Sequence, residues 1–270
     1  MKYFLDTEFL EGTQNKIIFG IKYGETKPTI DLISIGLVSE DERMYYAISK
    51  DFNLKEAWNR YDLVDDNSVG VRIGCLPNKR KVYWIRENVL KPIFVDLFIE
   101  DNTLNKAMCL EGHNRTAIEK KMTYNWLRNL IDKYGKSNKQ IAEEIKEFIS
   151  PIDARFDGHA GWYSTEDYLK INKPEFLAFY ADYDWVVFCW LFGRMIDLPD
   201  GFPYYCIDLK QELDNLNLKT VSADDLLNPY WSDNIKNHPD YPKQENEHNA
   251  LSDALWNFKL YKFLQNFKQL

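Results

Sequence analysis

Hydrophobic positions in the N-terminal part of the chain follow the short runs that are typical of β-strands. Residues 2–5 are mostly apolar and lead directly into Asp6, which predicts a buried strand that ends in an acid. Residues 29–39 are rich in β-branched side chains, and residues 43–48 follow them after an acidic turn. The pattern therefore predicts a hairpin beside the first strand.

Helical periodicity begins later in the chain and then alternates with further strands. Residues 139–149 place apolar side chains at positions 141, 142, 145, 148 and 149, which form one face of a helix. The remaining predicted elements are helices at 83–97, 117–134, 183–195 and 250–267 and strands at 174–180 and 204–207. Asp208 is expected to cap the helix that follows the last of these strands. This order predicts an α/β domain with a mixed central β-sheet flanked by helices.

Composition supports a folded core and narrows the class of partner. The chain has 270 residues, of which 45% are hydrophobic and 15% aromatic, so it can bury a sizeable core and disorder is excluded. Its 34 Lys and Arg against 42 Asp and Glu give a net charge of −8. This balance argues against a broad basic platform that coats nucleic acid, but it is compatible with a protein that holds a strand end.

We expect a cytoplasmic protein without membrane association. The most apolar window, residues 176–192, is interrupted by Asp182 and Asp184, which excludes a transmembrane helix. Asp6 interrupts the N-terminal apolar run, so no signal peptide is expected. The four cysteines are far apart in sequence and form no CxxC pair: Cys75, Cys109, Cys189 and Cys206. Reduced thiols fit this spacing better than a zinc site or a disulfide framework.

Asp6 and Glu8 are the first candidates for chemistry. On a strand, residues i and i+2 point to the same side, so the two carboxylates converge. Neighbouring carboxylates repel each other unless a cation lies between them, and hard cations such as Mg²⁺ prefer oxygen ligands. Such a triplet also arises by chance in an acidic chain, so a solvated strand end is the alternative.

A second candidate precedes the last predicted helix, where Asp253 follows His248 by five positions. If the helix begins near Asn249, Asp253 lies in its second turn with its side chain leaning toward the N-terminus. His248 then lies near a carboxylate without being a metal ligand, and it is suited to accept a proton from water. The other interpretation is a histidine that only caps or packs at the helix start.

A third candidate follows the predicted strand at 174–180. The carboxyl end of such a strand is where α/β sheets place ligand-binding groups, and Asp182 and Asp184 lie there. Asp184 has the stronger claim, because Asp182 lies nearer the strand and has no matching partner. N-capping of the next helix is the alternative for Asp184.

The order of these residues resembles that of the DEDDh 3′–5′ exonucleases of the RNase H-like (ribonuclease H-like) superfamily. The matching segments are FLDTEF at 4–9, FYADYDWVVF at 179–188 and HNALSDA at 248–254. The last segment indicates the histidine subtype, because the tyrosine subtype carries Tyr where this chain has Asn249.

The chain is further similar to the small bacterial 3′–5′ exoribonuclease family, called polyadenylate-specific ribonuclease-like. This resemblance covers about residues 1–58, 83–95 and 137–265. The chain departs from the family by extra sequence around 10–28, 59–82, 96–136 and 222–244. The resemblance therefore predicts a single DEDDh exonuclease domain over residues 1–270, with inserted segments near 59–82 and 96–136.

The resemblance implies an RNase H-like fold and a two-metal-ion nuclease that hydrolyses RNA from its 3′ end to nucleoside 5′-monophosphates. It assigns Asp6, Glu8 and Asp253 to one Mg²⁺ ion. It assigns Asp6 and Asp184 to a second, and Mn²⁺ is expected to substitute for either. His248 would be the general base. The implied partner is nucleic acid with a free 3′ end, RNA in preference to DNA, and the oligomeric state is open, with a homodimer as one option.

Two other functions stay open at this point. One is a 3′–5′ exodeoxyribonuclease on single-stranded DNA or 3′ overhangs, because no residue identifies a contact with a 2′-hydroxyl group. The other is a catalytically silent nucleic-acid-binding module, against which the complete set of four acids and a histidine argues. The basic runs at 79–81 and 120–121 are either solvated faces or phosphate contacts that guide a single strand. Phe9 is expected in the core, with a base-stacking platform as the alternative, and Trp185 either in the core or beside the site.

Overall fold

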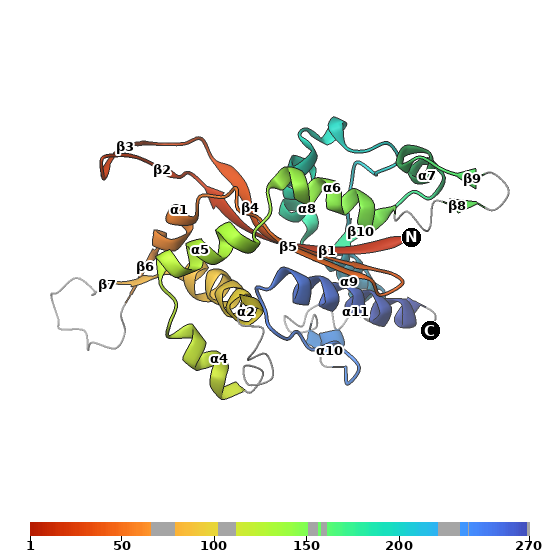
Figure 1. The fold of residues 1–270 in the computed structure, drawn as a ribbon. Coiled ribbons are helices and arrows are strands. Elements are labelled where there is room, and N and C mark those ends of the chain that lie inside the picture. The colour runs from red at the N-terminus through yellow and green to blue at the C-terminus, as the bar shows by residue number, and fades with distance from the viewer. Residues whose placement is uncertain are drawn as a thin grey trace. The chain divides into compact units, whose positions relative to one another are not determined.

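The computed structural model describes residues 1–65, 79–101, 112–150, 156–157, 161–220, 233–236 and 238–268 (Figure 1). Cys75 and Cys109, with parts of the predicted insertions, lie outside these residues. The chain forms two compact units. The first unit comprises Met1–Phe9, Leu32–Ser49 and Lys136–Leu270, and the second comprises Leu10–Asp31 and Lys50–Gly135. The second unit takes in nearly all of three predicted insertions, and the single-domain assignment stays a prediction.

A mixed five-stranded sheet forms the centre of the first unit, in the order β11-β10-β1-β4-β5. Its strands are β1 (Lys2–Gly12), β4 (Thr29–Ser39), β5 (Met44–Ile48), β10 (Glu175–Ala178) and β11 (Ile207–Asp208). β10 runs parallel to both β1 and β11, whereas β4 and β5 form the predicted antiparallel hairpin. The predicted α/β class with a mixed, helix-flanked sheet is confirmed, and the arrangement is compatible with an RNase H-like fold.

Alternation along β1 explains why helices cover both faces of this sheet. Tyr3 points to one face, where its ring contacts Phe148 of α6 (Asn138–Ile149). Phe4 points to the other face and contacts Phe258 of α11 (Ala250–Lys268). Figure 1 accordingly shows α6 and α8 on one side of the sheet and α9 and α11 on the other. β1 is therefore buried on both faces, and its polar side chains follow only where the apolar run ends.

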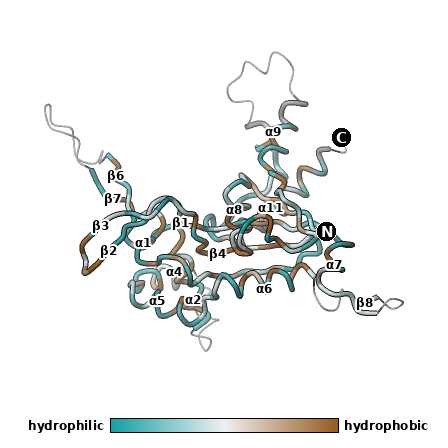
Figure 2. Tube along the Cα trace, turned by 90° about the horizontal axis from the view of Figure 1, so that it is seen from above, coloured by the Kyte–Doolittle hydropathy of each residue, from teal (hydrophilic) through white to brown (hydrophobic). Residues whose placement is uncertain are grey.

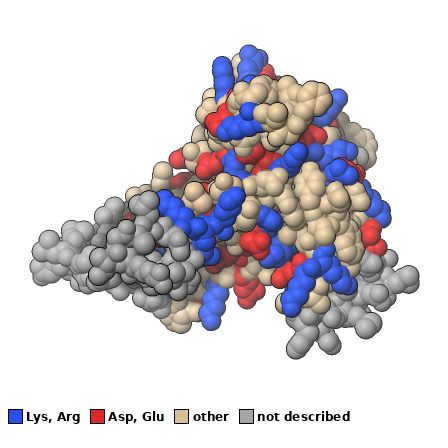
Figure 3. All heavy atoms as spheres, turned by 90° about the vertical axis from the view of Figure 1, so that its left-hand side faces the viewer, with Lys and Arg blue, Asp and Glu red and all other residues tan. Residues whose placement is uncertain are grey.

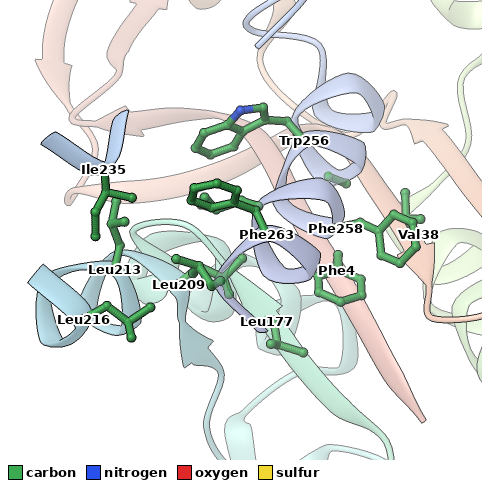
Figure 4. Packing of buried hydrophobic residues seen from close by; sticks show 13 residues of the cluster. Phe4, Val38, Leu177, Leu209, Leu213, Leu216, Ile235, Trp256, Phe258 and Phe263 are labelled. Atoms are coloured by element: carbon green, nitrogen blue, oxygen red, sulfur yellow. The ribbon is translucent and has the colours of Figure 1, made fainter. Parts of the chain in front are cut away.

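The α11 side of the sheet holds an extended cluster of buried apolar side chains (Figure 4). Phe4 of β1 and Leu177 of β10 lie under α11, and Leu209 and Leu213 of α9 (Leu209–Thr220) extend the cluster. Asp208 caps α9 as predicted, because its Oδ1 accepts a hydrogen bond of 2.7 Å from the Lys210 amide. This packing fixes α11 against the strand that carries the first two candidate acids.

Three of the predicted helices agree closely with the structure, and one is divided. The helix at 139–149 is α6, whose N-terminus is capped by Ser137, and the helix at 183–195 is α8 (Ala181–Phe192). The helix at 250–267 is α11. The predicted helix at 117–134 is instead α4 (Gly112–Glu119) and α5 (Tyr124–Tyr134), because Thr123 accepts a hydrogen bond from the Trp126 amide and begins a new helix. The first unit further contains β8 (Phe156–Asp157), β9 (Gly161–Trp162), α7 (Thr165–Ile171), η4 (Met195–Asp197) and α10 (Asp233–Lys236).

The second unit combines helices with two β-hairpins. Its other helices are α1 (Leu54–Asn59), the π-helix η1 (Arg86–Leu90) and α2 (Lys91–Asp101). The hairpins are β2 (Asn15–Ile18) with β3 (Ile21–Glu25), and β6 (Asp62–Asp65) with β7 (Lys79–Val82). Phe94, Phe98 and Trp126 join α2 to α5 through edge-on ring contacts. Of the helices in the described part of the chain, none combines the length and apolar character needed to cross a membrane.

Candidate active site

Asp6, Glu8 and Asp253 converge just beyond the part of β1 that pairs with β10. The pairing of β1 with β10 runs from Lys2 to Phe4, and the two acids follow within four residues. Each of the three side chains offers an oxygen atom, and these atoms lie within 4.8 Å of one another. Among the described residues this is the one group of three acids, cysteines or histidines with that geometry. Such spacing suits a single hard cation with oxygen ligands.

Close packing of α11 on the sheet brings Asp253 to this point. A Cβ atom on Gly36 of β4 would lie 2.2 Å from the carbonyl oxygen of Ala250, so only glycine allows this approach. The Asn257 Nδ2 atom donates a hydrogen bond of 2.9 Å to the carbonyl oxygen of Leu5. The helix starts at Ala250, so Asp253 lies in its first turn and the expectation of the second turn is wrong.

Asp184 joins the cluster through the residue between the two strand acids. Its Oδ1 accepts hydrogen bonds from the Thr7 amide at 2.9 Å and from Thr7 Oγ1 at 2.6 Å. The helix α8 begins three residues earlier, after Tyr180, so Asp184 does not cap it and that alternative is wrong. Asp182 is exposed, whereas Asp184 is buried. Of these two acids, Asp184 is therefore the one that contacts the strand between Asp6 and Glu8.

Burial raises the pKa of all four carboxyl groups, and repulsion from other acids of the cluster adds to the shift at Asp6, Glu8 and Asp184. Burial is the largest cause at Asp6, whose pKa lies well above its ordinary value, and the other three acids add to it. Burial also raises the pKa of Glu8 to about 8, with further contributions from Asp253 and Asp184. The pKa of Asp184 is raised by burial even though the Thr7 hydrogen bonds oppose the shift. Within the described chain no Lys or Arg contributes to these pKa values, and the one side chain whose positive charge opposes a shift is His248, at Asp253.

His248 precedes α11 in a left-handed backbone conformation, with φ of 66°. Its amide donates a hydrogen bond of 2.9 Å to Asp253 Oδ2, and Gln244 Nε2 donates one of 2.6 Å to Asp253 Oδ1. Burial raises the pKa of Asp253, while these two hydrogen bonds and the nearby His248 side chain oppose the shift. His248 lies outside the three-acid group, so the structure places it beside a candidate metal ligand.

Three residues that organise the site were missed by sequence reasoning. Thr7 lies within the segment FLDTEF at 4–9, and its hydroxyl group could have indicated a hydrogen-bond donor next to the two acids. Gln244 and Asn257 lie outside any motif pattern, so no local signal could have found them. Trp185 packs in the core against Phe176 and Phe188, and Phe9 lies against Tyr183 with its ring partly exposed. The contacts of Trp185 with Phe176 and Phe188 favour the core interpretation for this residue.

Comparison with known proteins identifies distant relatives. No protein-family model matches the chain. Two proteins of Mycobacterium tuberculosis, from strains CDC 1551 / Oshkosh and H37Rv, are each named 3′–5′ exoribonuclease. Each is 25% identical to this chain over 211 residues, which cover 78% of this chain and 73% of the relative. The chain is thus similar to exoribonucleases over most of its length.

Proposed function

We propose that this chain is a metal-dependent 3′–5′ exoribonuclease that releases nucleoside 5′-monophosphates from the 3′ end of RNA. The observation that carries the proposal is the convergence of four buried or half-buried carboxyl groups whose pKa values are all raised, with no Lys or Arg among the described residues contributing to those values. The relatives' names agree with the predicted enzyme class, a hydrolase that cleaves phosphodiester bonds, and they favour RNA over DNA. The DEDDh assignment and the cytoplasmic location stay predictions.

The donor set fits two divalent cations, with Mg²⁺ as the expected ion and Mn²⁺ as a substitute. Asp6, Glu8 and Asp253 would hold one ion, and Asp6 with Asp184 would hold the other. Bound there, the ions would lower the pKa of a water molecule and stabilise the charge on the attacking and leaving oxygens. The raised pKa values support this fit, because cations would relieve the repulsion that the fold imposes on these acids.

The protein's own groups supply positioning and proton transfer. Thr7 fixes the orientation of Asp184 by two hydrogen bonds to one oxygen, which leaves the other oxygen to face a ligand. His248 would accept the proton of the attacking water as the general base, because it lies next to the candidate metal ligand Asp253. The hydrogen bond between the His248 amide and Asp253 fixes the position of the proposed base relative to a proposed metal ligand.

The proposal is tested with matched RNA and DNA oligonucleotides labelled at the 5′ end, single-stranded or with a 3′ overhang, in Mg²⁺ and in EDTA. A 3′–5′ exonuclease yields a ladder of shortening labelled fragments, and we expect it on RNA, with Mg²⁺ alone. Asp6→Asn should lower turnover by about a thousandfold, because it removes several kcal/mol of charge stabilisation.

Asp182→Asn is the matched control, because Asp182 is an exposed acid on the helix that carries Asp184. It should retain wild-type turnover. Unchanged release of mononucleotides by Asp6→Asn, or immediate release of the labelled 5′ nucleotide, would contradict the proposal. A preference for DNA would correct the substrate and leave the site assignment standing.

A further inference from the structure

The hairpin β6–β7 and the turn after it carry a group of basic side chains in the second unit. Lys79, Arg80 and Lys81 of β7 are exposed, and Arg86 follows at the start of η1. Figure 3 shows the side on which Figure 1 labels β3 and β7, and several Lys and Arg side chains lie on that face among acidic ones. We call Tyr61, Lys79, Arg80, Lys81 and Arg86 the β6–β7 surface.

Aromatic rings, and not carboxylates, hold two of these cations. Lys81 Nζ lies 4.1 Å from the centre of the Tyr61 ring, and the Arg86 guanidinium lies 3.6 Å from that of Tyr83. Arg86 Nε is buried without a hydrogen-bond acceptor among the described residues. A ring face attracts a cation without cancelling its charge, so its remaining donors stay available. Asp65 pairs in register with Lys79, yet within the described chain the four basic residues form no ion pair.

The distribution of charge between the units points to the same surface. The first unit has 16 Lys and Arg against 27 Asp and Glu, a charge of −11. The second has 18 against 15, a charge of +3. The total of −8 therefore conceals a basic unit in an acidic chain. A polyanion is attracted to the second unit and repelled by the surface of the first.

We propose that the β6–β7 surface binds single-stranded RNA, with its Lys and Arg side chains on backbone phosphates and the Tyr61 ring against a base. This proposal rests on the proposed function, because it takes RNA as the substrate. Lys and Arg interleaved with aromatic rings are what sequence-tolerant binding of a single strand requires: cations follow the backbone and rings stack on bases. Arg and Lys already held by rings lose less side-chain entropy when a phosphate binds.

The test compares two double variants that remove the same charge from the second unit. Lys79→Gln/Lys81→Gln changes the surface, whereas Lys120→Gln/Lys121→Gln changes the basic run after α4. Binding of a single-stranded RNA of roughly twelve nucleotides is measured by fluorescence anisotropy in EDTA, which prevents cleavage, over a series of salt concentrations.

We expect Lys79→Gln/Lys81→Gln to weaken binding on the order of tenfold, and to lower the salt slope by about 1.4, since each contact with a single strand contributes about 0.7. Lys120→Gln/Lys121→Gln should match the wild type. Tyr61→Leu should also weaken binding, and Tyr61→Phe should restore it because it keeps the ring. In Mg²⁺, the ratio of kcat/KM for this RNA to that for a dinucleotide should fall only in the β6–β7 variants.

Two outcomes would overturn the proposal. One is equal affinity and salt slope in the two double variants. The other is unchanged RNA binding by Lys79→Gln/Lys81→Gln together with loss of binding to an acidic protein, which would make the surface a protein contact. If the wild type cleaves no RNA in Mg²⁺ while the anisotropy results hold, the proposed function fails and the RNA-binding surface stands.

Discussion

The two units of this chain use charge in opposite ways. In the first unit, four acids are brought together around β1 and α11, their pKa values are raised by burial, and those of Asp6, Glu8 and Asp184 are raised further by neighbouring acids of the cluster. In the second unit, three exposed basic side chains lie on β7 and a fourth lies at the start of η1, and two of the four rest on rings. Buried negative charges that repel one another are stabilised by a bound cation, whereas exposed positive charges attract a polyanion. This difference in charge distinguishes the proposed catalytic site of the first unit from the proposed RNA-binding surface of the second.

The largest expected effect is loss of the proposed base. His248→Ala should lower kcat by roughly 10²–10⁴, the range that general base catalysis contributes, while RNA affinity in EDTA stays the same because the β6–β7 surface is untouched. Mg²⁺ affinity by calorimetry should also be retained, since His248 is assigned as base and not as ligand. His238→Ala, another histidine of the first unit, is the control and should retain activity. Loss of Mg²⁺ binding in His248→Ala would make His248 a ligand.

A second prediction concerns the stability of the metal-free protein against pH. The folded-state pKa of Glu8, about 8, lies above its ordinary value of 4.5. Between these values the folded form keeps a proton that the unfolded chain has released, so stability falls as pH rises through this window. We expect the free energy of unfolding in EDTA to fall by a few kcal/mol between about pH 5 and 8, and Mg²⁺ to reduce the slope.

The Glu8→Gln variant sharpens this prediction. It should raise the melting temperature of the metal-free protein near pH 8 while lowering activity, because it removes a repelled charge from the cluster. Glu11→Gln, at an exposed position of the same strand, should leave the pH dependence unchanged. A melting temperature that is independent of pH in EDTA would show that the four acids do not repel one another.

Much of the first unit could be predicted because its information is local. The apolar run of β1, the β4–β5 hairpin and the period of α6 each lie within one short segment. The candidate acids were found in the same way, since each follows or begins an element that the pattern already marks. The order of these acids along the chain then indicated the resemblance to the DEDDh exonucleases.

Contacts between distant segments could not be predicted. Asn257 meets the backbone of Leu5, and Gly36 admits the backbone of Ala250, across more than 200 residues of sequence. The helix α8 starts at Ala181, two residues before the predicted start. The left-handed backbone conformation of Tyr180, which precedes it, cannot be predicted from the sequence pattern. The cation–ring pairs of the second unit depend on the fold of the hairpin in the same way.

A third prediction compares the same change, glycine to alanine, at one position in each unit. Gly36→Ala would place a methyl group against the backbone of α11, so it should cost about 1–3 kcal/mol and lower activity by displacing Asp253. Gly24→Ala in β3 meets no atom within 4 Å and should change stability by less than about 0.5 kcal/mol. Thermal unfolding and turnover measure both. Equal effects would contradict the close approach of α11 to the sheet.

The smallest expected effect lies at the tip of the β2–β3 hairpin, where Figure 2 shows hydrophobic residues around the turn. Phe19 is 100% exposed and, like Gly20, has a positive φ, so the two residues form a tight turn between Ile18 and Ile21. Asn followed by Gly is the favoured pair in such a turn, and a bulky residue there is strained. Phe19→Asn should therefore slow amide hydrogen exchange across β2 and β3, by an amount equal to roughly 0.5–1 kcal/mol, and leave turnover of a dinucleotide unchanged. Faster exchange would mean that the exposed ring stabilises the hairpin, and that this part of the second unit depends on apolar contacts as the first unit does.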